Sequence, residues 1–239
     1  MIWFDNIQAL GQCPPYDMQS MERVLEPEVM DTWEDAVEYD AMDFTDVNTA
    51  FANEAIALGP TAGLLLDVGT GTARIPILIC QQRPWLLRAI DLSQNMLKVG
   101  TQNITRAWLS TQIKLELVDA KSMPYADNEF DMVISNSIVH HLPDPMPCFR
   151  EINRVLKPNG ALLLRDLIRP TDNATVDALV SRIGAEYNPY QAKLFGDSLR
   201  AAFTVDEIRE MITAAGFAGV EVYQSSDRHW TAKRPYSLA

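Results

Sequence analysis

The stretch Leu64-Leu65-Leu66-Asp67-Val68-Gly69-Thr70-Gly71-Thr72-Ala73-Arg74-Ile75-Pro76 decides the fold class of this chain. An apolar run reaches an acidic residue and two closely spaced glycines, and the pattern predicts a strand, a turn and the start of a helix. Gly69 and Gly71 permit backbone dihedrals closed to other residues and let a ligand approach the main chain. A dinucleotide-binding turn needs glycine at its sixth position, where this chain has Arg74, so the NAD pattern fails.

From residue 64 onward, short apolar runs alternate with helical stretches, which predicts an α/β protein with a mostly parallel sheet wound on both faces. The expected strands lie near 64–68, 86–91, 113–118, 130–135 and 160–166, and the expected helices near 72–82, 93–107 and 145–156. Lys157-Pro158-Asn159-Gly160 is expected to turn from the last of these helices into the fifth strand.

The two ends of the chain differ from this regular core. We expect residues 1–60 to form an N-terminal helical cap over a domain at 61–239, which carries an insertion at about 170–203. The chain is then expected to close with a helix near 204–215, capped by Gly216, and strand-like runs near 219–224 and 229–234, one of them antiparallel.

Composition excludes several classes of protein. The 239 residues carry 32 acidic and 20 basic side chains, a net charge of −12, and no dense basic cluster, so no nucleic-acid partner is expected. The three cysteines show no metal or redox spacing and are expected to be packing residues, so no metal site is expected. Because no leader-like start and no span of about 18 apolar residues is seen, we expect a cytoplasmic protein without a membrane span.

Two further motifs accompany the glycine turn. The run from Phe130 to Pro145 reads Phe-Asp, an apolar strand, a polar turn, then His-His-Leu and a proline-bounded helix, and Val155–Leu164 follows it. Together with Asp67-x-Gly69-x-Gly71-x-Ala73, these motifs resemble the class I S-adenosylmethionine (SAM)-dependent methyltransferases over residues 61–168. Ala73 departs from the family pattern, which usually has a third glycine there. The resemblance implies a Rossmann-like fold, SAM as cofactor and an N-terminal helical lid.

Asp91 follows Asp67 by 24 positions, at the end of the second predicted strand, where such folds hold an acid against ribose hydroxyls. Its alternative role is to cap the helix that begins near Ser93. The resemblance places Asp119 beside the adenine, with apolar surface from Leu92 and Met96, although core packing explains those two equally well. The full set of expected cofactor-binding residues is Asp67, Gly69, Thr70, Gly71, Asp91, Leu92, Met96, Asp119, Ala120, Asn136 and the lid residue Tyr39.

Methyl transfer from SAM is an in-line displacement that needs alignment and the exclusion of water, plus a base when the acceptor is a hydroxyl or an acidic carbon. The candidate catalytic residues are His140 and His141, just past strand four, and Asp166, at the end of strand five. Each has a structural alternative: the histidines as turn caps, and Asp166 in an ion pair. We expect Asp166 or Arg169 to face the acceptor pocket.

The acceptor is expected to be a small molecule methylated on oxygen or carbon. Strand four ends in Ser135-Asn136-Ser137-Ile138, without the Asn/Asp-Pro-Pro-Phe/Tyr motif of many enzymes that methylate nucleobase or amide nitrogen. Two other functions stay open: a non-catalytic SAM-binding or assembly factor on the same fold, and a nucleotide oxidoreductase, which Arg74 disfavours.

Overall fold

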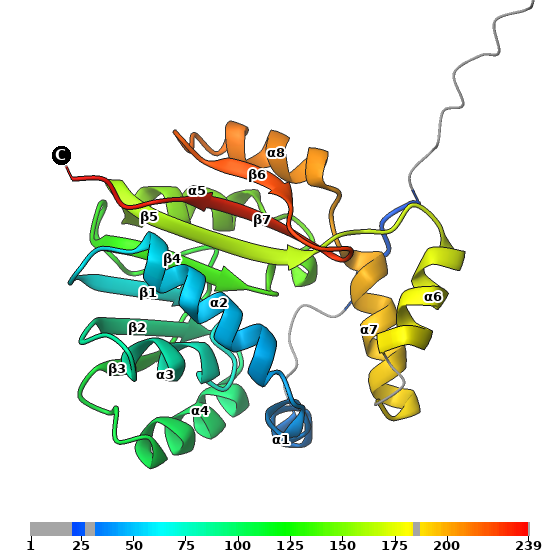
Figure 1. The fold of residues 1–239 in the computed structure, drawn as a ribbon, viewed down its shortest axis with the longest axis horizontal. Coiled ribbons are helices and arrows are strands. Elements are labelled where there is room, and N and C mark those ends of the chain that lie inside the picture. Colours follow the sequence, from blue (N-terminus) through cyan, green and yellow to red (C-terminus); the bar gives the residue numbers. More distant parts are fainter. Residues whose placement is uncertain (1–20, 27–31, 184–186, 239) are drawn as a thin grey trace, which may run out of the picture.

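The computed structural model describes residues 21–26, 32–183 and 187–238, which surround one seven-stranded sheet (Figure 1). The strand order is β3-β2-β1-β4-β5-β7-β6. The strands are β1 (Leu64–Val68), β2 (Leu86–Asp91), β3 (Ile113–Leu117), β4 (Phe130–Asn136), β5 (Leu156–Leu167), β6 (Glu221–Gln224) and β7 (His229–Arg234). Because the chain runs outward from β1 to β3 and then returns to β4, the order reverses between β1 and β4, which is where open α/β sheets bind ligands.

The predicted fold class is confirmed. Strands β1 to β5 pair in parallel, and β7 runs antiparallel to β5 with Leu162 opposite Arg234. The central strands are covered on both faces, so they consist of nearly continuous apolar residues and show no alternation with polar ones.

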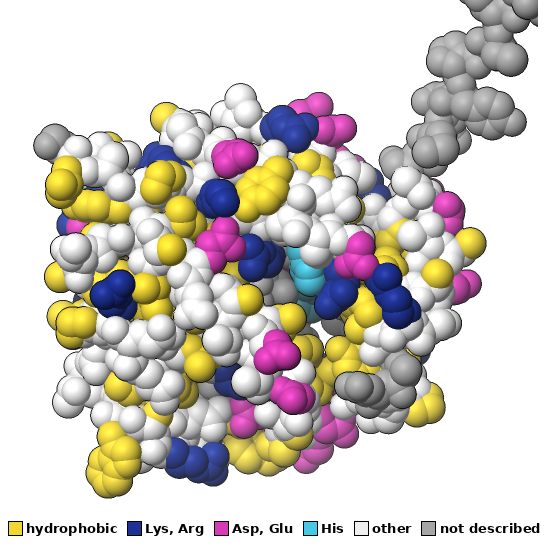
Figure 2. Space-filling view, in the orientation of Figure 1, with side chains coloured by type: hydrophobic (Ala, Val, Ile, Leu, Met, Phe, Trp, Pro, Cys, Tyr) yellow, Lys and Arg dark blue, Asp and Glu magenta, His cyan; other side chains and the backbone are white. Residues whose placement is uncertain are grey.

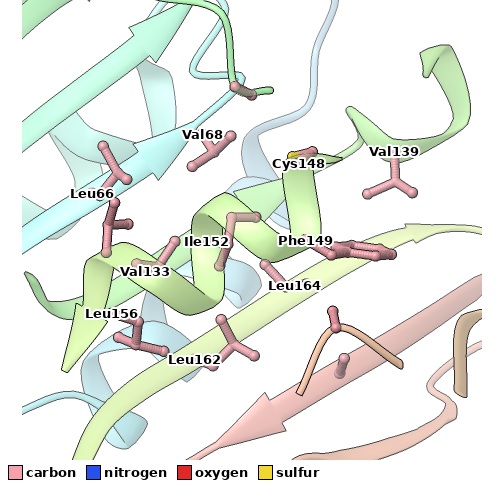
Figure 3. Close-up of a cluster of buried hydrophobic side chains, with 14 of the residues drawn as sticks. Leu66, Val68, Val133, Val139, Cys148, Phe149, Ile152, Leu156, Leu162 and Leu164 are labelled. Carbon is pink, nitrogen blue, oxygen red and sulfur yellow. The ribbon is translucent and has the colours of Figure 1, made fainter. Parts of the chain in front are cut away.

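Helices cover the two faces of the sheet in separate groups. On one face lie α2 (Thr45–Leu58), α3 (Arg74–Cys80) and α4 (Gln94–Arg106), whose apolar side chains share a cluster with Trp85 and Met132. On the other face lie α5 (Met146–Val155) and α8 (Val205–Ala214). Figure 3 shows Cys148, Phe149 and Ile152 of α5 directed at side chains of the sheet. Cys80 and Cys148 are buried, as expected of packing residues, and Cys13 lies outside the described residues.

Three segments gather beyond the carboxyl ends of the strands. They are α1 (Trp33–Ala41), the short stretch 21–26, and a hairpin of α6 (Asn173–Ile183) and α7 (Pro189–Ala201), which lies to the right of the sheet in Figure 1. The hairpin falls within residues 170–203, and its assignment as an insertion stays a prediction. The proposed boundary at residue 60 stays a prediction, because α2 packs within the core of the sheet through Phe51 and Ala55.

One predicted turn was wrong. Lys157 to Gly160 belong to β5, which begins directly where α5 ends. Phe130 pairs with Leu156 but Met132 pairs with Ala161, so four residues of β5 oppose the single residue Asp131. The Pro-Asn-Gly sequence therefore forms a bulge within the strand, which explains why it resembles a turn.

Candidate functional site

A cleft with about 800 Å³ of empty space opens at the carboxyl ends of β1, β2, β3 and β4. Its walls come from the loops that follow these strands and from α1, and a smaller recess under the first loop adjoins it. All eleven residues expected to bind the cofactor line one of these two spaces: Asp67, Gly69, Thr70, Gly71, Asp91, Leu92, Met96, Asp119, Ala120, Asn136 and Tyr39. Tertiary structure thus brings together positions spread over almost a hundred residues.

Both glycines of the turn after β1 have positive φ, but only Gly69 is also required by a lack of space. Gly69 has φ +76°, and a Cβ there would lie 2.7 Å from the side chain of Ile138, so both conformation and space require glycine. Gly71 has φ +55°, but its Cβ would make only an ordinary contact of 3.5 Å with Tyr39. The N–H groups of Gly69 and Thr70 both donate to the Ile90 carbonyl at 2.9 Å, which ties this turn to the end of β2.

Asp91 lines the cleft and holds two backbone N–H groups in place. Its Oδ2 accepts the Gly71 N–H at 2.8 Å, and its Oδ1 accepts the Ser93 N–H at 2.9 Å. The cap of α4 is Ser93, whose side chain accepts from Met96 N, so Asp91 does not cap the helix itself but holds the N–H of the capping residue. Each carboxylate oxygen keeps a further lone pair, so Asp91 can hold the turn and still accept two hydroxyls.

Asp67 lies in the recess beneath the glycine turn and is 2% exposed. Burial raises the pKa of Asp67 to about 7; the hydroxyl of Thr70 opposes this shift, and the negative charge of Asp91 adds to it. The hydroxyl of Thr72, which lines the same recess, is buried without a hydrogen-bond partner. The recess thus contains polar groups whose hydrogen-bonding capacity is unused, a property expected of a site for a cationic, polar ligand end.

The opposite end of the cleft is lined by apolar groups around one acid. Leu92 is 44% exposed although it is apolar, whereas Met96 is 5% exposed and packs against α1. Asp119 follows β3, and its Oδ1 accepts the Lys121 N–H at 2.8 Å. An exposed leucine beside a carboxylate suits a flat heteroaromatic ring with an amino group, because the ring covers the leucine and the amine donates to the acid.

Tyr39 closes the cleft from α1, and Arg74 holds it there. The Arg74 guanidinium donates to the carbonyls of Tyr39 at 3.1 Å and Met42 at 2.7 Å, and its Cζ lies 5.1 Å from the centre of the Tyr39 ring. Arg74, which breaks the NAD pattern in the sequence, therefore has a structural role, because it holds the end of α1 next to the glycine turn.

The two adjacent histidines occupy a 3-10 turn, η1 (Val139–His141), after β4. His140 is buried, and its Nδ1 lies 2.5 Å from Oδ1 of Asp166 on β5. Burial lowers the pKa of His140, but the charge and hydrogen bond of Asp166 and the charge of Glu26 outweigh it, so this pKa lies above its ordinary value. His141 lines the cleft, and 24% of its side chain is exposed. Figure 2 shows one face of the molecule, on which a hollow lies beside the α6–α7 hairpin.

Asp166 and Arg169 are placed differently from the expectation that one of them faces the acceptor pocket. Asp166 is 1% exposed and also accepts the backbone N–H of His140 at 3.1 Å, so it fixes the η1 turn from behind. Arg169 is buried and pairs with Glu207 at 2.6 Å. The structural alternative therefore applies to both side chains.

Sequence reasoning missed several residues of the site, among them Ser93, Ile138 and Glu26. Ser93 and Ile138 line the cleft, and only their positions next to Asp91 and in the polar turn after β4 pointed to them. Glu26 was missed because it precedes the histidines by more than a hundred residues, yet its Oε1 lies 2.7 Å from Nδ1 of His141.

Fold and cleft together are those of an α/β protein with a crevice at the switch point of its sheet, the position where such folds bind nucleotide-type cofactors. Residues 66–164 match a family described as a methyltransferase domain. The chain is 31% identical over 173 residues to the demethylmenaquinone methyltransferase of Geobacillus stearothermophilus, a match that covers 66% of this chain and 71% of that protein. The chain belongs to the class I SAM-dependent methyltransferases, and SAM is its cofactor.

Other relatives fit this family. The 27-O-demethylrifamycin SV methyltransferase of Amycolatopsis mediterranei is 26% identical over 170 residues, which span 70% of this chain and 59% of that protein. The fold is shared by a solved structure from Methanococcus maripaludis described as a putative SAM-dependent methyltransferase, with a TM-score of 0.66 at 20% identity, covering 92% of this chain and 99% of the other. Among the residues that the structure describes, no helix has the length and apolar character to cross a membrane.

Proposed function

We propose that this protein transfers the methyl group of SAM to an oxygen or carbon atom of a small molecule. The observation that carries the proposal is the order of groups across the sheet: Asp67 on β1, Asp91 on β2 and Asp119 after β3, with His141 after β4 on the other side of β1. This order matches the parts of SAM: an amino acid end, a ribose, an adenine and, at its centre, a sulfonium methyl group.

In the proposed arrangement, Asp67 receives the ammonium of SAM directly or through water. Asp91 accepts the two ribose hydroxyls, and Asp119 accepts the adenine amine while Leu92 covers the ring. Tyr39, fastened by Arg74, closes the cleft above the bound cofactor. The methyl group then faces the wall formed by η1.

The reaction forms a bond between the acceptor atom and the methyl carbon and breaks the bond between that carbon and sulfur. An acceptor hydroxyl or acidic carbon also loses a proton. His141 is the histidine that lines the cleft, so it is placed to take that proton, while His140 and Asp166 position the turn behind it. The relatives named above act on a demethylmenaquinone and on a demethylrifamycin, and both names are consistent with a small organic acceptor.

The replacement Asp91→Ala tests the cofactor's place in the cleft. Loss of a hydrogen-bonded charge should weaken SAM binding by about 1.5–3 kcal/mol, measured by titration calorimetry. Asp177→Ala is the matched control, because Asp177 is an exposed acid on α6 and its variant should bind SAM as the wild type does. Unchanged affinity in Asp91→Ala would reject the ribose assignment.

The acceptor itself is sought with isotopically labelled SAM and a metabolite extract. A labelled small molecule, identified by mass spectrometry, would give its identity and the methylated atom. If SAM binds but no extract yields a labelled product, methyl transfer is rejected in favour of a non-catalytic SAM-binding protein.

A further inference from the structure

A cluster of potential metal ligands lies where the stretch 21–26 crosses η1. One ligand atom from each of Glu26, His140 and His141 can be chosen so that all three lie within 4.8 Å of one another. We propose that these three side chains bind one divalent transition-metal ion at the acceptor end of the cleft. Spacing along the chain predicts no metal site, because only folding brings Glu26 to the two histidines.

The distances within the cluster suit an ion of this kind. Nε2 of His140 lies 3.5 Å from Oε1 of Glu26, and Nδ1 of His141 lies 2.7 Å from the same oxygen. Ligands at about 2.0–2.2 Å from zinc are roughly 3–3.5 Å from each other, so the first pair already fits and the second must open by less than 1 Å.

The nitrogen of His141 gives the most direct support. Although Nδ1 lies close to the Glu26 carboxylate, the two groups are not aligned for a hydrogen bond, and this nitrogen is buried without a hydrogen-bond partner. A buried ring nitrogen needs a hydrogen-bond partner or a metal ion, and this nitrogen has no hydrogen bond even to the carboxylate beside it. A cation shared by the two groups would satisfy both.

His140 is already prepared to act as a ligand. Asp166 holds its Nδ1 at 2.5 Å, which leaves Nε2 on the side of Glu26. Metal-bound histidines usually donate their other nitrogen to a carboxylate in this way, because the hydrogen bond fixes the tautomer and the orientation of the ring. Asp166 thus acts as a positioning residue for the proposed site.

The charges of the cluster also favour a cation. Side chains of Glu26 and Asp166 are 8% and 1% exposed, and the ion pairs that the structure gives these carboxylates are with the two histidines. The nearby Arg23 donates to backbone carbonyls, namely those of His140 at 3.0 Å and Leu142 at 2.8 Å. With neutral histidines, these two carboxylates and the Arg23 guanidinium carry a net charge of −1, which still favours a cation.

Arg23 explains how Glu26 is held in place. In addition to its contacts with η1, its Nε donates to the Ala201 carbonyl at 2.5 Å, and its guanidinium stacks 3.8 Å over the ring of Phe203. Glu26 itself accepts a hydrogen bond from Ser198 on α7 at 3.2 Å. The stretch is therefore anchored to both the turn and the hairpin, as a preorganised ligand set requires.

Two imidazoles and one carboxylate suit Zn²⁺, Fe²⁺ or Co²⁺, and such sites leave coordination positions open for a substrate. His141 reaches the cleft, so an ion bound there would meet an acceptor molecule. This role rests on the proposed function: the ion would bind an acceptor hydroxyl, whose proton passes to water, and the resulting oxygen would attack the methyl carbon. In the metal-loaded protein the ion therefore replaces the His141 ring in promoting loss of that proton.

Cobalt binding to the full, tag-free chain tests the site independently of methyl transfer. We expect one Co²⁺ per chain, with a visible absorption spectrum of nitrogen and oxygen ligation and no thiolate band. Glu26→Gln should weaken binding at least about 100-fold, more than the 10–100-fold loss that outer-shell changes cause. Glu22→Gln is the matched control, because Glu22 is an exposed glutamate on the same stretch and its variant should bind like the wild type.

His141→Gln provides a second variant if Glu26→Gln does not fold, and it should show the same loss. The proposal is overturned if the wild type binds no Co²⁺ more tightly than these variants do, or if a thiolate band shows that a cysteine holds the ion. SAM titrations of the same proteins distinguish this failure from failure of the proposed function, because the cofactor site lies on other residues.

Discussion

Binding of SAM should release a proton from Asp67. Burial raises the pKa of this carboxyl to about 7, so in the free protein it is about half protonated at neutral pH. If the ammonium of SAM settles beside it, the positive charge lowers the pKa and drives the carboxyl to its ionised form. Each SAM molecule that binds then releases a fraction of a proton, which would not happen if Asp67 had only a structural role.

The size of the effect follows from the pKa. Protons released per SAM should be about 0.9 at pH 6, about 0.5 at pH 7 and about 0.1 at pH 8. The sign is fixed by the direction of the shift: the ionised form binds the cation, so affinity rises with pH up to about 7 and then levels off. Below pH 7 affinity should fall towards tenfold per pH unit, or about 1.4 kcal/mol.

Titration calorimetry at one pH in two buffers with different enthalpies of ionisation counts the protons directly. Asp67→Asn should bind SAM more weakly and abolish the release, whereas the exposed control Asp177→Asn should keep it. Heats that do not depend on the buffer between pH 6 and 7 would refute the reasoning, since either Asp67 is already ionised or the ammonium lies elsewhere.

Two further predictions concern backbone conformation. Gly69→Ala should lower the free energy of unfolding by about 3 kcal/mol, because it adds a clash with Ile138 to an unfavourable φ, whereas Gly71→Ala should cost only about 1–2 kcal/mol. Equal costs in urea unfolding would show that space at Gly69 is not limiting. Trp108 has φ +59° just after α4 and is 91% exposed, so Trp108→Gly should raise the free energy of unfolding by about 1 kcal/mol. A lower melting temperature in that variant would contradict this account.

Most of the fold could be predicted because the central strands are recognisable in the sequence as apolar runs. Leu64–Val68 and Phe130–Asn136 are buried on both faces, so each is a continuous apolar run that ends in polar residues, and the ends of such runs mark the edge where ligands bind. Prediction failed at Lys157–Gly160, because a bulge and a turn favour the same residue types.

The proposed cofactor site could be predicted equally well, since Asp67, Asp91 and Asp119 lie at or just beyond the carboxyl ends of three strands of one parallel sheet and must therefore meet at one edge. The acceptor end of the site could not be predicted in this way. Asp166 also lies near the carboxyl end of a strand, β5, yet its side chain bonds to His140, because a buried imidazole needs a hydrogen-bond partner.

The amino-acid sequence by itself determined the sheet, the glycine turn and the acids at the strand ends. These features depend on local conformation and on the alternation of apolar strands with helical stretches along the chain. Only the tertiary structure decided that Glu26 joins the two histidines and that Arg74 fastens α1. Both contacts link residues more than thirty positions apart through side chains, and no local pattern encodes such a distance.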